Sequence, residues 1–236
     1  MAVADKLETA LTSVDWNGNV LAFVKDKRPA EELASANMKL AVWSRQFEIA
    51  DRNNPSLCFI REMQVAGQHV TALIALALYK AAAGSMRAVF ETALYYIYFR
   101  THLSELATLA RDSRFFLEKK ELLEYHKQHT PNFVEVQRAL GLNSRLEAWY
   151  SKVSSIIHGQ IPGTWVEHKS LGEIKPIKAT QDISISTFVE GVEIVHRLFL
   201  CTVGGELWDR FSSDSKKQLL HGMSGDEKAV LRLDLG

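Results

Sequence analysis

The chain has 236 residues, 47% of them hydrophobic, so it can bury a substantial core, and the composition argues against disorder. Its 28 basic and 28 acidic residues cancel, which excludes a global attraction to nucleic acid or anionic membranes and leaves local patches open. The charged N-terminus does not fit a signal peptide, and the apolar run at 70–79 has about half the length that a bilayer requires. We therefore expect a cytoplasmic protein without membrane association.

Hydrophobic residues recur with helical spacing along most of the chain, which predicts an all-α protein. A turn is expected at WNGN, 16–19, and Pro29 fits the first turn of the helix that follows it. The small residues at 81–85 are expected to separate two helices, and Asn143 or Ser144 to cap a later one. The helices are expected at about 4–14, 29–50, 56–80, 86–102, 103–111, 115–128, 132–140, 144–158 and 184–211.

A stretch rich in glycine and proline near 160–180 predicts an ordered loop or a short hairpin around Leu171-Gly172. Ser224 is expected to cap a short helix in the C-terminal tail. The sequence thus predicts an antiparallel helical bundle at 55–211, with an N-terminal helical arm at 1–54 and a small C-terminal helical appendage at 212–236.

Common cofactor and nucleotide motifs are absent from the sequence, so we expect no cofactor and no metal. His126 and His129, three residues apart on a helix, could share a metal in a bundle hydrolase, but no second Glu-x-x-His helix matches them. A solvated helix face is the expected role of these histidines. Cys58 and Cys201 are expected to be buried thiols without a disulfide.

The helix that ends at His158 carries a polar row on one side. The row consists of Glu147, Ser151, Ser154 and His158, at steps of four, three and four residues. One interpretation makes His158 a general acid or base, or a phosphate contact, with the row as its hydrogen-bonding neighbours. Another makes it a structural histidine at the helix C-terminus, followed by Gly159 in the left-handed conformation. Ser154 and His158 could also pair as nucleophile and base, although no oxyanion hole is recognisable.

Arg87 and Glu91 lie one helical turn apart at the edge of an apolar stripe, and Tyr98 falls on the same edge. Such a pair can fix the packing of two helices as a structural ion pair. It can also line a cleft and orient a catalytic group. Both interpretations stay open from the sequence.

Two segments resemble bacterial helical proteins of the HEPN superfamily, including abortive-infection-type members. They are GSMRAVFETALYYIYFRTH at 84–102 and YSKVSSIIHG at 150–159. The resemblance implies a helical bundle that forms a homodimer and acts as a metal-independent ribonuclease in an antiviral-defence or toxin-type system, in which a partner protein can take part. Family members place an arginine four to six residues before the histidine. His158 matches that histidine, whereas Lys152 has the spacing and the charge of the arginine without its planar fork.

The resemblance implies that His158 acts as general acid or base on the 2′-hydroxyl or the leaving oxygen of RNA. Lys152, or Arg87 from another helix, would stabilise charge on the phosphate. Trp165 and His168, which follow in the loop, would stack on or contact a base.

The alternative is a catalytically inactive helical module that binds a partner protein or a small signal. This interpretation fits the neutral net charge and the missing arginine. It predicts an apolar surface patch, on the N-terminal helix around Trp43 and Phe47 or on the tail.

Overall fold

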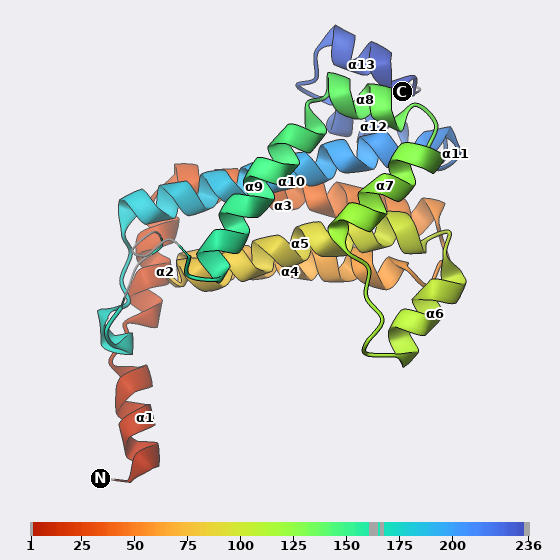
Figure 1. Ribbon diagram of the computed structural model, residues 1–236. Coiled ribbons are helices and arrows are strands. Elements are labelled where there is room, and N and C mark those ends of the chain that lie inside the picture. Colours follow the sequence, from red (N-terminus) through yellow and green to blue (C-terminus); the bar gives the residue numbers. More distant parts are fainter. Residues whose placement is uncertain (1, 161–164, 166–167, 234–236) are drawn as a thin grey trace.

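The computed structural model describes residues 2–160, 165 and 168–233. Within these residues the chain forms helices and no strand, which confirms the all-α prediction, and no helix is long and apolar enough to cross a membrane. The elements are α1 Val3–Thr12, α2 Trp16–Lys25, α3 Lys27–Ala50, α4 Leu57–Ala75, α5 Tyr79–Phe99, α6 Leu103–Arg111, α7 Lys119–His129, α8 Phe133–Ala139, α9 Leu142–Ile157, the 3-10 turn η1 Leu171–Glu173, α10 Lys178–Thr202, α11 Gly204–Trp208, α12 Ser213–Leu220 and α13 Gly225–Leu231 (Figure 1).

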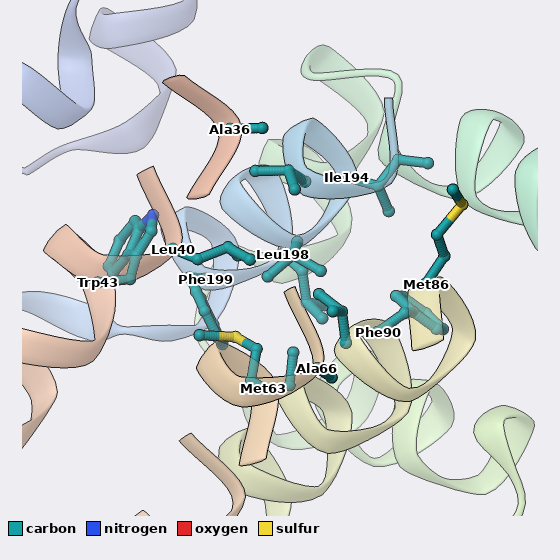
Figure 2. Packing of buried hydrophobic residues seen from close by; sticks show 14 of the residues in the cluster. Ala36, Leu40, Trp43, Met63, Ala66, Met86, Phe90, Ile194, Leu198 and Phe199 are labelled. Carbon is teal, nitrogen blue, oxygen red and sulfur yellow. The ribbon is translucent and has the colours of Figure 1, made fainter. Parts of the chain in front are cut away.

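The centre of the bundle is built by the long helices α3, α4, α5 and α10, and α9 crosses them on one side (Figure 1). Large side chains from all four long helices meet in the middle (Figure 2). The fully or almost fully buried ones include Leu40 and Trp43 of α3, Met63 of α4, Met86 and Phe90 of α5, and Leu198 and Phe199 of α10. A core made by amphipathic helices of similar length is the packing expected for an antiparallel bundle.

The expected break between the helices at 56–80 and 86–102 exists, but it lies at 76–78 and not at 81–85. Ala77 has a φ of 61°, and the N–H of Leu78 donates to the carbonyl of Leu73 at 2.8 Å, which closes α4 in a Schellman-type turn. Glycine usually occupies that left-handed position, so an alanine there carried no sequence signal. Gly84 lies inside α5 instead.

The starts of three helices differ from the prediction, and local hydrogen bonding or conformation explains two of them. The turn predicted at 16–19 is wrong, since α2 begins at Trp16 after the Asp15 carboxylate accepts from the N–H of Gly18 at 2.8 Å. α9 begins at Leu142 after Gly141, whose φ is 62°, and not at a cap on Asn143 or Ser144. α10 begins at Lys178 rather than near 184, and the left-handed Gly204 separates it from α11.

The two ends of the chain differ in how they join the bundle. α1 projects from it and buries none of its residues (Figure 1). α3, which lies within the predicted arm, packs in the core. Trp43 and Phe47 are 0% and 1% exposed, so the prediction that these two side chains form an apolar surface patch is wrong. Ser224 caps α13 as predicted, accepting from the N–H of Glu227 at 3.2 Å.

The division of the chain at residues 54 and 211 stays a prediction, and a single core crosses both positions. In the loop, residues 161–164 and 166–167 lie outside the described residues, and Leu171-Gly172 belong to η1 rather than to a hairpin. Cys201 is buried as predicted, whereas Cys58 is exposed on α4, and neither forms a disulfide.

Candidate functional site

The polar row of α9 lies along one edge of α5, and the two helices run antiparallel. The ring of Tyr150 contacts Phe90 with centroids 5.7 Å apart. Nine residues later on α9, a Cβ placed on Gly159 would lie 3.4 Å from Nζ of Lys80, which precedes Phe90 by ten residues on α5. Ser154 falls between these two contacts, one turn from each. We call this edge the α5–α9 strip; it consists of Lys80, Arg87 and Glu91 of α5 with Tyr150, Ser154 and His158 of α9.

Arg87, Glu91 and Tyr150 form one connected group. Nε of Arg87 lies 2.7 Å from Oε1 of Glu91, and the Tyr150 hydroxyl donates to the same oxygen at 2.9 Å. Burial, together with the hydrogen bond to Glu91, raises the pKa of Tyr150 to about 12, so its hydroxyl stays protonated and donates. The Arg87 guanidinium carbon lies 4.9 Å from the centre of the Tyr150 ring. The pair predicted as structural or catalytic therefore joins α5 to α9.

A second cation also approaches the same ring. Nζ of Lys119, on α7, lies 4.5 Å from the centre of the Tyr150 ring and 2.6 Å from Oε2 of Glu147. A cation over an aromatic face is attracted by the ring quadrupole. Glu147 therefore pairs with α7 at one end of the polar row, and it lies away from His158 at the other end.

The hydroxyls and the imidazole of the row have no protein partner among the described residues. Oγ of Ser154 is buried and lacks a hydrogen bond there. Ser151 and His158 are exposed, and their side chains make no hydrogen bond to any residue that the structure describes. Gly159 has a φ of 65° and follows His158 at the end of the helix, as predicted. The imidazole of His158, at the exposed C-terminal end of α9, is therefore accessible to a ligand.

Lys152 does not join His158 within one chain. Six residues at about 100° each add up to about 600°, so the side chains of Lys152 and His158 leave α9 about 120° apart and on different sides. Nζ of Lys152 accordingly donates to Oγ1 of Thr187 on α10 at 3.0 Å. The cations on the His158 side are Arg87 and Lys80.

Tyr98 belongs to a different group from Arg87. Its hydroxyl donates to Oε2 of Glu105 at 2.7 Å, and its ring stacks on His102 with centroids 4.0 Å apart. The ring of Tyr125 packs against that of Tyr98 in a T-shaped arrangement, with the two ring centroids 5.1 Å apart. Tyr98 therefore supports the junction of α5, α6 and α7, and it does not extend the α5–α9 strip.

The two loop residues predicted to contact a base differ in exposure. Trp165 is 5% exposed, so its ring is not available for stacking, and its Nε1 has no partner among the described residues. His168 is half-buried. The prediction of a base-stacking tryptophan is wrong for this structure because the ring packs into the core.

Of the two α7 histidines, His129 is exposed as expected, whereas His126 is buried. His126 is 3% exposed, and burial lowers its pKa to about 4, so the ring is neutral near pH 7. Its Nδ1 lies 2.8 Å from Oγ1 of Thr130, and His129 packs against the ring of Tyr125. Among the described residues, no three side chains of the types that bind metals lie close enough together to hold an ion.

Sequence reasoning missed Lys80, Lys119 and Tyr150. Helical periodicity alone places Tyr150 on the apolar side of its helix, but a tyrosine at the border of such a side can pack its ring and still present its hydroxyl. The two lysines had no sequence signal, since their place depends on how α5 and α7 pack against α9.

Comparisons of this chain with protein-family models, curated proteins and solved structures gave no match. The function of the α5–α9 strip is therefore argued from its geometry.

Proposed function

We propose that the α5–α9 strip binds RNA and that His158 cleaves it as a general acid or base, in a homodimeric, HEPN-like ribonuclease of a defence or toxin-type system. The observation that supports this proposal is the alignment of a guanidinium, an unpartnered hydroxyl and a free imidazole along one edge of two packed helices. These groups are Arg87, Ser154 and His158.

The three groups match the needs of phosphodiester cleavage without a metal. Nε of Arg87 donates to Glu91, and the terminal N–H groups of the guanidinium can donate to a phosphate oxygen. Oγ of Ser154 lies below the surface of the strip, so it can donate to a phosphate oxygen only when the side chains around it move. The imidazole of His158 can accept the proton of the 2′-hydroxyl, whose oxygen then attacks phosphorus, or protonate the 5′-oxygen as its bond to phosphorus breaks. In a homodimer the second copy supplies a second imidazole, so each histidine performs one transfer.

Growth and total RNA after induced expression test this proposal. Wild type should arrest growth and cleave RNA, and purified wild type should cleave RNA in the presence of a chelator. His158→Ala and Arg87→Ala should each lower the cleavage rate at least about 100-fold, the usual contribution of such groups. Lys152→Ala is the matched control, because it removes a cation that belongs to the same helix but contacts α10, and it should cleave RNA like wild type.

Each variant has to retain its helical circular dichroism before its rate is interpreted. Cleavage by His158→Ala at the wild-type rate would reject the catalytic role of this histidine. Wild-type protein that neither arrests growth nor cleaves RNA would favour the inactive module that binds a partner protein or a small signal.

A further inference from the structure

α1 presents an apolar stripe that no described part of the chain covers. Val3, Leu7 and Leu11 recur at every fourth residue, and they are 85%, 59% and 46% exposed. Helical spacing places Glu8 along one edge of this stripe and Lys6 along the other. A helix of ten residues is marginal in water by itself, so a surface that covers the stripe would stabilise α1.

A surface of matching length and polarity runs along the outer side of α3. Two grooves adjoin there and share Met38, Val42 and Gln218 in their walls; one continues to Leu219 of α12 and the other to Ile49 at the end of α3. Met38 and Ile49 are 56% and 57% exposed. The twelve residues from Met38 to Ile49 span about 18 Å of helix, and the ten residues of α1 span about 15 Å. We call this surface the α3 groove.

The charges of the two surfaces are opposite. The walls of the α3 groove include Lys39, Arg45 and Arg210 against one carboxylate, Asp214. α1 carries two carboxylates and one lysine. Lys39 and Arg210 already pair with carboxylates of their own chain, whereas Arg45 has no ion pair with any residue that the structure describes.

The side chain of Glu8 likewise pairs with no described residue, so an unpaired carboxylate borders the stripe and an unpaired guanidinium lines the groove. Lys6 and Asp214 also lack an ion pair among the described residues. An unpaired carboxylate beside an apolar stripe and an unpaired guanidinium beside an apolar groove are complementary features of a protein interface.

We propose that α1 of one copy docks into the α3 groove of a second copy, and that the exchange is reciprocal and forms a symmetric dimer. Glu8 then lies beside Arg45 of the partner subunit. The groove of the same chain is out of reach, because α1 points away from the end of the bundle that carries α12 (Figure 1). When both exchanges form between the same two chains about a twofold axis, the assembly closes as a symmetric pair. This proposal is independent of the ribonuclease activity.

Sedimentation velocity of the full chain tests the dimer. Wild type should sediment as a dimer, and Leu7→Asp and Met38→Asp should each sediment as monomers, because each buries a carboxylate in the apolar contact. Both side chains are exposed in the isolated chain, so neither change should unfold it. Thr9→Asp is the matched control, because residue 9 lies on the opposite side of α1, and it should stay dimeric.

A charge exchange identifies the partner surface. Glu8→Arg and Arg45→Glu should each raise the dissociation constant of the dimer about tenfold by placing like charges together. The double variant should return the constant to near the wild-type value.

A monomeric wild type would overturn the proposal. A Leu7→Asp monomer beside a Met38→Asp dimer would also overturn it, since α1 would then pair with a different surface, such as α1 of the second copy. Monomeric wild type that binds phosphatidylcholine vesicles, with binding lost in Leu7→Asp, would assign the stripe to a lipid surface instead.

Discussion

His196 is a fully buried imidazole whose role differs from that of the exposed His158. Its Nδ1 accepts a hydrogen bond from Nε1 of Trp43 at 3.0 Å, so this nitrogen carries no proton. Burial lowers the pKa of His196 to about 4, and the charges of Glu193, Lys39, Arg197 and Glu227 around it largely offset one another. A buried neutral histidine makes the stability of the bundle depend on pH.

We expect the free energy of unfolding to fall as the pH decreases from about 6.5 to about 4. The folded-state pKa of about 4 lies below the unfolded value of about 6.5, so the unfolded chain binds the proton first. At pH 5 this difference amounts to about 2 kcal/mol for one histidine. His196→Gln keeps an acceptor for the Trp43 indole and does not titrate.

Urea denaturation at pH 8 and pH 5 measures how much free energy of unfolding wild type and His196→Gln each lose between the two pH values. The loss should be about 2 kcal/mol smaller in His196→Gln than in wild type. Other titrating groups contribute equally to the two proteins. An equal loss in both would show that His196 is not responsible.

The hydroxyl of Tyr150 is expected to stabilise the contact between α5 and α9. Tyr150→Phe removes the hydrogen bond to Glu91 and keeps the contacts of the ring with two cations, so the free energy of unfolding should fall by about 1 kcal/mol. Tyr95→Phe is the control, because no hydrogen bond of the Tyr95 hydroxyl to a described residue is present. Chemical denaturation of both variants gives the comparison, and equal losses would contradict the role assigned to the Tyr150 hydroxyl.

At the scale of elements, glycine has opposite effects in two helices. At Gly191 of α10, an added Cβ would lie 2.5 Å from Cζ2 of Trp149, whose indole donates to the carbonyl of Thr187 at 2.8 Å. At Gly84 of α5, an added Cβ would meet nothing within 4 Å. The close approach of α9 and α10 therefore requires glycine, and the exposed position in α5 does not.

Gly191→Ala should lower the free energy of unfolding by about 1–3 kcal/mol, because it overpacks the crossing of α9 and α10. Gly84→Ala should raise it by about 0.5–1 kcal/mol, because alanine restricts the unfolded chain and favours helix. Thermal or urea denaturation measures both changes. A stable Gly191→Ala protein would mean that the indole of Trp149 can move without cost.

Hydrophobic periodicity predicted the helix ranges correctly where common capping residues mark the helix ends. The helix expected at 103–111 matches α6, and the Ser224 cap begins α13. The break after α4 was misplaced because Ala77 adopts a conformation that glycine usually adopts. Such ends depend on hydrogen bonds that the residue types alone do not determine.

At the scale of the whole molecule, the proposed exchange of α1 links stability to concentration. Association stabilises the folded chain by mass action, so the melting temperature of wild type should rise as the protein concentration increases. The melting temperature of Leu7→Asp should not change with concentration. Calorimetry at several concentrations measures both, and a wild-type melting temperature independent of concentration would contradict the dimer.

The sequence by itself determined the helical class, most helix ranges, the left-handed Gly159 and the one-turn spacing of Arg87 and Glu91. These features are local, because each depends on residues within about four positions of one another. Only the tertiary structure decided that Lys152 contacts α10, that Trp43 and Trp165 are buried, and that the α9 row borders α5. Periodicity defines the sides of a helix, whereas long-range packing decides which neighbour each side meets.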